Sequence, residues 1–370
     1  MQIKTETYNR LSIFDDKGKV RNRIFLIVAK SGWGKGLLGE SIVEEYHKAG
    51  YVVLCIADPK DEIEYGYSMF EPIESYHVKE LRAMGKLQGT KKVKLYHPFT
   101  FRIPKYALPE TNFYTFPLKT LGRNEWSMIA ETSWDTDTIK LLLNVSQNIG
   151  KKDGLYGFVH YLRDIVKGQH IGRKVKTDPK NFHLDVTSGT VKSLQDITNY
   201  LQPFKTDYFL SSSESKLNLD WKSILSDREN YHVFTSHYLD DPKMKEFCVM
   251  ALFNAVIKNK EYAKYPILFV IPEVRYLTPF RPQGYQLFLA MGMKDHFSRI
   301  RSMGRGMSAL MDTQVYSGVD EEVINSATDT LLGELGGIRD VEKVVKAKGY
   351  GKDIRNKLTS MEMDNTFFLM

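Results

Sequence analysis

The chain has 370 residues, with 52 lysines and arginines against 45 aspartates and glutamates, which gives a formal net charge of +7. This length accommodates one large α/β domain with an insertion, or two domains, and the mild positive charge is compatible with a polyanionic partner without identifying one. The two cysteines, Cys55 and Cys248, lie far apart in apolar surroundings. They argue against a disulfide framework, leave no Cys-x-x-Cys metal site and fit a reducing interior.

The N-terminus lacks the cationic and apolar blocks of a signal peptide. No apolar run approaches the roughly 20 residues that a membrane helix needs. We therefore expect a soluble, cytoplasmic protein without a membrane partner, located in the host cytoplasm if the chain is viral.

A glycine-rich turn follows the first expected strand. Ile24–Ala29 is an apolar run typical of a buried parallel strand, and apolar residues recur at helical spacing over Leu37–Lys48. The turn between them consists of Ser31, Gly32, Trp33, Gly34, Lys35 and Gly36. In such a turn the backbone N–H groups and the helix N-terminus bind phosphates, and the lysine reaches the outer ones.

The turn matches the phosphate-binding pattern G-x-x-x-x-G-K-[ST] only in part. Gly34 and Lys35 agree with it, whereas Ala29 stands at the first glycine and Gly36 replaces the hydroxyl residue. A glycine-rich turn without a ligand is the alternative, although it leaves a lysine at a helix N-terminus, where a cation is unfavourable.

Strands and helices continue to alternate after this turn. Tyr51–Ile56 and Val93–Tyr96 are the next expected strands. Alternation of this kind implies a parallel sheet with right-handed crossovers, whose ligands bind at the carboxyl ends of the strands. Lys35 and Asp58 both fall at that edge.

The pattern changes between about Arg123 and Arg228. Helical periodicity appears at Thr136–Ile149, Gly154–Val166 and Val191–Leu201, and the stretch Lys167–Asp185 is polar and cationic. We interpret residues 123–228 as a mainly helical insertion with a basic loop. Residues 1–122 and 229–370 are then the two parts of one α/β core.

The second part of the core returns to strands separated by helices. The expected strands are Tyr231–Ser236, Ile267–Ile271, Met307–Met311 and Thr330–Leu335, with a last edge strand at Thr366–Met370. The expected helices are Pro242–Asn259 and Gln286–Arg301.

Four short motifs lie near the ends of these strands. They are Asp58-Pro-Lys after the second strand, Glu273 after an apolar strand, Gly304-Arg305 before a strand, and Thr313-Gln314 at the end of that strand. In register with the Lys35 turn, they make the chain similar to the HerA/FtsK superfamily of P-loop DNA-pumping ATPases. The resemblance runs from about Arg21 to the C-terminus. It implies a RecA/FtsK-like P-loop NTPase fold of class α/β, with a mainly parallel sheet flanked by helices.

The resemblance also implies roles for the residues that bind nucleotide. Lys35 is expected to neutralise the β- and γ-phosphates, with the N–H groups of Gly32, Trp33 and Gly34 around them. Asp58 is expected to lie near the site and to orient the turn.

The catalytic roles follow from the same resemblance. Glu273 is expected to be the general base for the attacking water, and Gln314 the sensor of the γ-phosphate. Arg305, or Arg301 or Arg299 in its place, is expected to be an arginine finger that reaches a neighbouring subunit's site. On residue type alone, Glu273 and Gln314 could also be ordinary polar strand ends, and the arginines solvated.

Two residues depart from the family pattern. Gly36 stands where the family has the Mg²⁺-binding Ser or Thr, and Pro272 stands where it has the Asp before the catalytic Glu. Magnesium can still be held by phosphates and water, with Ser31, Asp58 or Asp312 as alternative protein groups. A subunit that binds nucleotide without hydrolysing it is one outcome. We expect the other, a retained ATPase with ATP and Mg²⁺ as cofactors.

The resulting hypothesis is an ATP-driven motor that assembles as a homo-hexameric ring and translocates double-stranded DNA, either packaging a viral genome or moving plasmid DNA. The basic loop at Arg173–Lys180 would contact DNA phosphates, and a portal, nuclease or capsid component would be a further partner. The alternatives are a nucleotide-binding assembly or scaffold subunit, and a secretion or morphogenesis ATPase.

Overall fold

The structure is a computed structural model of the chain. It describes residues 22–56, 93–100, 111–131, 136–148, 150, 154–164, 175–176, 183–184, 195–199, 201, 210–236, 239–302, 306–348 and 368–369.

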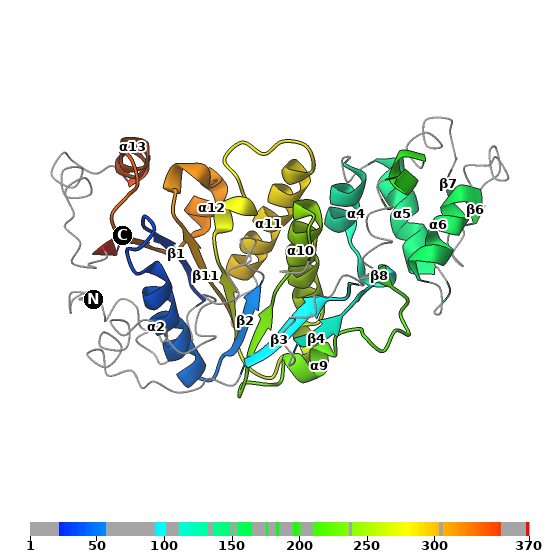
Figure 1. Ribbon diagram of the computed structural model, residues 1–370, viewed down its shortest axis with the longest axis horizontal. Helices are drawn as coiled ribbons and strands as arrows, with labels where there is room; N and C mark the ends of the chain where they lie inside the picture. Colours follow the sequence, from blue (N-terminus) through cyan, green and yellow to red (C-terminus); the bar gives the residue numbers. More distant parts are fainter. Residues whose placement is uncertain are drawn as a thin grey trace.

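The described residues form a nine-stranded sheet with the order β13-β12-β1-β11-β10-β2-β9-β3-β4 (Figure 1). Its strands are β1 (Ile24–Val28), β2 (Val52–Ile56), β3 (Val93–Pro98), β4 (Thr111–Tyr114), β9 (Tyr231–Phe234), β10 (Ile267–Ile271), β11 (Met307–Thr313), β12 (Asp329–Leu332) and β13 (Phe368–Leu369). Neighbouring strands from β12 to β4 run parallel, and β13 pairs antiparallel with β12. The predicted α/β fold with a mainly parallel sheet is therefore confirmed.

The central strands β1, β2 and β10 are apolar throughout because helices cover both faces of the sheet. Every residue of β1, β2 and β10 is buried. Helix α2 (Lys35–Lys48) packs on one face, together with Phe25 and Ile27 of β1. Helices α10 (Pro242–Lys258) and α11 (Tyr285–Ser302) lie on the other face (Figure 1), where Ile24 and Leu26 point.

Further helices lie beside α10 and near the β12–β13 edge of the sheet (Figure 1). They are α4 (Arg123–Ala130), α5 (Asp137–Asn148), α6 (Leu155–Asp164), α9 (Trp221–Ile224), α12 (Glu321–Ser326) and α13 (Ile338–Lys348), and residues 195–199 are also helical. Figure 1 shows α4, α5 and α6 beyond α10, at the end of the molecule opposite α13. Among the described helices, none is both long and apolar enough to cross a bilayer.

Helix α4 approaches α11 closely at a glycine. A Cβ built on Gly292 would lie 2.8 Å from the Met250 sulfur and 3.2 Å from the Asn124 Cβ. A side chain at this position would crowd the place where α4, α10 and α11 pack together. The start of the region 123–228 is thus packed directly against two helices that cover the sheet.

The structure also contains strands that the sequence did not indicate. Strand β4 is short, only partly buried and without an apolar run, yet it pairs in parallel with β3. Strand β5 (Phe116–Pro117) pairs with β8 (Leu210–Ser211). Within the expected basic loop, β6 (Val175–Lys176) and β7 (His183–Leu184) form an antiparallel pair.

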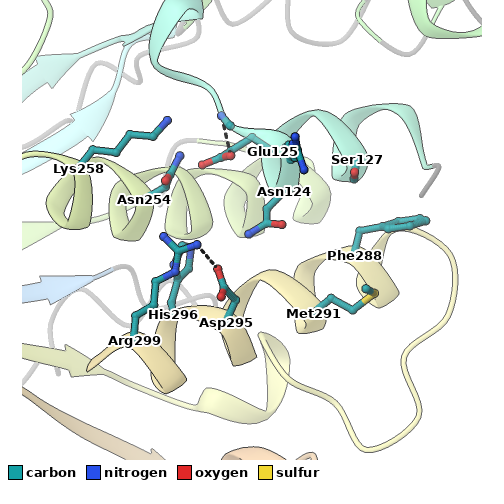
Figure 2. A pocket seen from close by; sticks show the side chains of 12 residues that line it. Asn124, Glu125, Ser127, Asn254, Lys258, Phe288, Met291, Asp295, His296 and Arg299 are labelled. Carbon is teal, nitrogen blue, oxygen red and sulfur yellow. Dashed lines mark hydrogen bonds and ion pairs between the residues drawn. The ribbon is translucent and has the colours of Figure 1, made fainter. Parts of the chain in front are cut away.

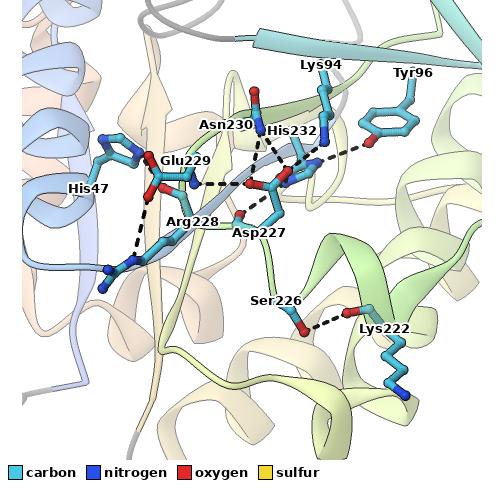
Figure 3. A network of polar contacts seen from close by, with 10 residues as sticks. All are labelled: His47, Lys94, Tyr96, Lys222, Ser226, Asp227, Arg228, Glu229, Asn230 and His232. Carbon is cyan, nitrogen blue, oxygen red and sulfur yellow. Dashed lines mark hydrogen bonds and ion pairs between the residues drawn. The ribbon is translucent and has the colours of Figure 1, made fainter.

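A polar network ties three elements together where β3 and β9 begin (Figure 3). The Asp227 carboxylate accepts hydrogen bonds from the Lys94 ammonium at 2.7 Å and from the Asn230 side chain at 2.8 Å. His47, in the last turn of α2, contacts the carbonyl of Arg228 at 2.7 Å. The network therefore fixes α2, β3 and β9 at the amino edge of the sheet, opposite the β1–α2 turn.

Two buried histidines make the stability of this fold depend on pH. His232 and His296 are both 1% exposed. Burial lowers the pKa of each imidazole to about 4, although Asp227 and Asp295 act in the opposite direction. The unfolded chain therefore binds these protons more readily than the folded one. Full stability is expected above pH 6.5, with a progressive loss between pH 6.5 and 4.

We expect the free energy of unfolding to fall by about 2 kcal/mol per histidine between pH 7 and 5. Urea titrations at the two pH values measure this difference. His296→Gln should make the dependence shallower. Equal dependences in wild type and His296→Gln would contradict the assignment.

Candidate functional site

The turn between β1 and α2 has the geometry of an anion-binding site. Gly32 and Gly34 have φ angles of 78° and 85°, in the left-handed region that favours glycine. No side chain caps α2, whose N-cap residue is Gly34. Ser31, Gly32 and Gly36 are exposed, and a Cβ built on Gly32 or Gly36 would meet nothing within 4 Å. The open, uncapped N-terminus of α2 is therefore suited to a phosphate group.

The lysine of this turn folds back across it. The Lys35 ammonium donates hydrogen bonds to the carbonyl of Ala29 at 2.9 Å and to that of Lys30 at 3.4 Å. These contacts hold the cation beside the first residues of the turn. The position fits the predicted role of Lys35 as the group that neutralises the outer phosphates.

The Trp33 side chain is fully buried beneath the turn, where it packs against Gly333 and Ala29. The Trp33 backbone N–H contacts the Lys30 carbonyl at 3.4 Å. A Cβ built on Gly333, just after β12, would overlap the Trp33 ring and lie 2.7 Å from the Cβ of Ala29. The tryptophan side chain is thus an anchor of the turn and lies away from the predicted phosphate position.

Lys30 and Glu334 fasten the same turn to the end of β12. The Lys30 N–H donates to the Glu334 carbonyl at 2.8 Å, and the two side chains form an ion pair at 2.5 Å. The Lys30 ammonium also lies 5.8 Å from the centre of the Trp33 ring. The shape of the turn is therefore set jointly by its own glycines and by residues 333–334.

The strand order brings the predicted catalytic residues next to the turn. Strand β11 lies between β1 and β10, and the N–H of Ala29 contacts the Thr313 carbonyl at 3.3 Å. Gln314 directly follows β11 with a half-buried side chain, and Glu273 follows β10. Lys35, Gln314 and Glu273 thus stand at the carboxyl ends of three adjacent strands.

Glu273 is held in an uncommon backbone conformation. Its φ and ψ are 48° and 53°, in the left-handed region that non-glycine residues rarely adopt. Its N–H donates to the Asp312 Oδ1 at 3.0 Å, and its carbonyl accepts from the Tyr276 N–H at 3.0 Å. The side chain is buried, with one carboxylate oxygen 3.4 Å from the Arg275 Nε.

Sequence reasoning singled out neither the Arg275 contact nor the Asp312 hydrogen bond. The Arg275 ion pair forms within the short 3₁₀ turn after β10, a turn that the sequence did not indicate. An arginine two residues after the candidate base was the only available signal.

Two predicted site residues, Asp58 and Arg305, lie outside the described residues. The alternative finger residues, Arg299 and Arg301, are exposed in the last turn of α11. This turn leads into the start of β11, a strand of seven residues that spans about 20 Å. Arg299 and Arg301 are therefore at the opposite edge of the sheet from Lys35, and Arg299 pairs with Asp295 at 2.9 Å.

A cavity of about 580 Å³ with both polar and apolar lining lies between α4, α10 and α11 (Figure 2). Figure 2 shows Asn254 and Lys258 of α10 on one side of it, and His296 and Arg299 of α11 on the other. It is lined by none of the predicted nucleotide-binding residues. The P-loop site is instead an open rim at the opposite edge of the sheet.

The groups around the turn fit a nucleotide whose metal ion is held mainly by phosphates and water. Gly36 and Pro272 offer no metal ligand, and no group of three or more acidic, His or Cys side chains is arranged around a metal site in the described part of the chain. Mg²⁺ commonly uses one or two carboxylates together with substrate phosphates. Asp312, which is 6% exposed, is the described carboxylate that contacts the backbone of Glu273.

Comparison with known proteins gives matches at the level of the fold. No family model and no curated protein sequence matches the chain. Among solved structures, the plasmid coupling protein TrwB in complex with a GTP analogue has a TM-score of 0.57 at 13% identity, over 93% of this chain and 81% of TrwB. A TrwB complex with ADP and Mg²⁺ gives a TM-score of 0.54 at 12% identity, over 93% and 81% of the two chains.

VirB4 of Thermoanaerobacter pseudethanolicus has a TM-score of 0.53 at 15% identity, over 92% of this chain and 84% of VirB4. The chain thus has the α/β fold of P-loop NTPases. Its similarity to VirB4 and TrwB is a similarity of fold, and it agrees with the fold that the predicted resemblance implies.

Proposed function

We propose that the chain is an ATPase of the HerA/FtsK type that couples hydrolysis of ATP to the movement of double-stranded DNA. One observation carries this proposal: the uncapped N-terminus of α2 and the Lys35 ammonium stand beside Glu273 and Gln314 on adjacent strand ends. A phosphate clamp, a general base and a polar sensor at one sheet edge are the parts that phosphoryl transfer to water requires.

Each group has a distinct part in the proposed reaction. The N–H groups at the start of α2 bind the phosphates, and Lys35 neutralises their charge. The Glu273 carboxylate accepts a proton from the attacking water, which Gln314 helps to orient. Bound Mg²⁺ would neutralise charge on the phosphate oxygens.

The position of the arginines supports a ring of identical subunits. Arg301 is at the edge of the sheet opposite Lys35, so it can reach a nucleotide only in a neighbouring copy. Head-to-tail contacts of this kind close into rings. We propose a homo-hexamer in which Arg305 or Arg301 serves the adjacent site. The basic loop at Arg173–Lys180 would contact duplex phosphates.

The cargo is proposed as plasmid or viral DNA. TrwB is described as a plasmid coupling protein, which favours plasmid DNA on grounds of fold similarity. Packaging of a viral genome is the other form of the proposal, with a portal, nuclease or capsid component as partner.

A non-hydrolysing assembly or scaffold subunit is the second candidate function. It is favoured by Gly36 and Pro272, which remove both usual protein contributions to the metal. The buried and positioned Glu273 favours hydrolysis, because nucleotide binding alone requires no carboxylate at that place. A secretion or morphogenesis ATPase would keep the site and use a different cargo.

Phosphate release with and without double-stranded DNA tests the proposal. We expect DNA to stimulate turnover in the wild type, and Lys35→Ala to abolish both basal and stimulated release. Lys216→Ala, at an exposed lysine remote from the turn, should retain them. Nucleotide binding without turnover would favour the scaffold, and turnover indifferent to DNA would favour the secretion or morphogenesis ATPase.

A further inference from the structure

We propose that Asp312 on β11 supplies the carboxylate for the Mg²⁺ water shell that β10 cannot supply because of Pro272. This inference rests on the proposed function, since it concerns the metal of the bound nucleotide. In the resembled family, the carboxylate that orients the metal-bound water directly precedes the catalytic Glu. Here the proposal places it on the neighbouring strand, and of Ser31, Asp58 and Asp312 it selects Asp312.

The first support is that Pro272 and Asp312 lie on the same face of the sheet. On β10, Leu268 and Val270 belong to the core cluster under α2, so Pro272, two residues further on, continues that face. On β11, Leu310 belongs to the same cluster, and Asp312 is the next residue on its face. Both positions therefore lie on the side of the sheet from which α2 and its turn project.

The second support is the register of β10 and β11, which places Pro272 beside Asp312. Ile271 of β10 pairs with Met311 of β11, and one further step brings Pro272 beside Asp312. The hydrogen bond from the Glu273 N–H to Asp312 Oδ1 shows that the two strand ends stay adjacent beyond the last ladder pair. The carboxylate is thus displaced sideways by one strand, or about 4.8 Å.

The direction of this displacement favours the role. Strand β11 is the immediate neighbour of β1, and Ile27 pairs with Asp312 two residues before the turn begins at Ala29. Asp312 is consequently one strand nearer than Pro272 to the strand that carries the turn. A carboxylate there can orient a metal-bound water without direct ligation, which suits an ion that retains most of its waters.

Ser31 fits this role less well than Asp312. Of the two other candidates, the structure describes only Ser31, which is exposed on the turn, and Asp58 lies outside the described residues. Asp312 is 6% exposed and already fixed by the backbone of Glu273.

The experiment compares the affinity for a fluorescent ATP analogue in EDTA and in Mg²⁺, for the wild type and Asp312→Asn. Asparagine retains an oxygen that accepts the Glu273 N–H but removes the charge. We expect Asp312→Asn to bind as the wild type does in EDTA and to lose about 10- to 100-fold of the affinity gained with Mg²⁺. The double variant Asp312→Asn/Pro272→Asp restores a carboxylate on the neighbouring strand and should recover part of that gain.

A second measurement uses the unmodified chain and needs no variant. Fe²⁺ in place of Mg²⁺, with ascorbate and peroxide, cleaves the backbone next to the bound metal. We expect nucleotide-dependent cuts at the turn and at the end of β11 near Asp312.

The results distinguish a failure of the proposed role of Asp312 from a failure of the proposed function. Cuts at the turn alone, or an unchanged Mg²⁺ effect in Asp312→Asn, would overturn the role of Asp312 and leave the proposed function intact. A wild-type chain that binds no nucleotide in either medium would instead overturn the proposed function.

Discussion

Replacing Glu273 by glutamine is expected to lower the rate of ATP turnover by about 10²- to 10³-fold, with nucleotide affinity close to that of the wild type. Glutamine keeps the size of the side chain but cannot accept a proton from water. The Glu273 carboxylate is buried at the end of β10, and its backbone N–H is held by Asp312. Single-turnover phosphate release and a parallel nucleotide titration measure the two quantities.

Glu214→Gln is the matched control, because Glu214 is an exposed carboxylate outside the site. It should turn over ATP at the wild-type rate. Wild-type turnover in Glu273→Gln would remove Glu273 as the general base. A loss of nucleotide affinity equal to the loss of rate would mean that the side chain only supports the shape of the site.

The second large effect is expected from Gly333→Ala. The added methyl group would overlap the buried Trp33 ring and approach the Ala29 Cβ to 2.7 Å, so either the ring or the turn has to move. Overpacking of this kind costs about 1–3 kcal/mol. We expect a lower melting temperature together with weaker nucleotide binding, measured by thermal unfolding with and without ATP.

Two further variants show whether the cause is this contact. Trp33→Leu removes the ring, so Trp33→Leu combined with Gly333→Ala should lose less stability than the sum of the single changes. Gly336→Ala is the matched glycine control, since a Cβ there meets nothing within 4 Å. Strict additivity in the double variant would show that Trp33 and Gly333 do not act through each other.

Most of the fold could be predicted because the central strands are continuous apolar runs. Strand Ile267–Ile271 was predicted with its observed bounds, and β1 and β2 to within one residue. Strand β4 was missed because its stability comes from pairing with β3 and not from an apolar run of its own. The order of the strands was not predicted, although that order is what places β11 between β1 and β10.

The candidate site could be predicted only where a local pattern carried it. Lys35, Glu273 and Gln314 belong to motifs that can be recognised along the chain. The Trp33–Gly333 packing joins residues 300 positions apart, and the Glu273–Asp312 hydrogen bond joins residues 39 positions apart. Contacts at such separations depend on how the sheet is assembled, which no local pattern encodes. The roles of Asp58 and Arg305 stay predictions.

The attachment of the β1–α2 turn to residues 333–334 has a mechanical consequence. Lys30 and Trp33 bind the stretch that leads from β12 into α13, near the edge strand β13. A turn clamped in this way cannot change shape alone when a triphosphate arrives or leaves, because the clamp transmits any displacement to that stretch. If the proposed nucleotide binds, its arrival would displace the β12–β13 edge of the sheet. A subunit packed against that edge would then respond to the nucleotide without contacting it.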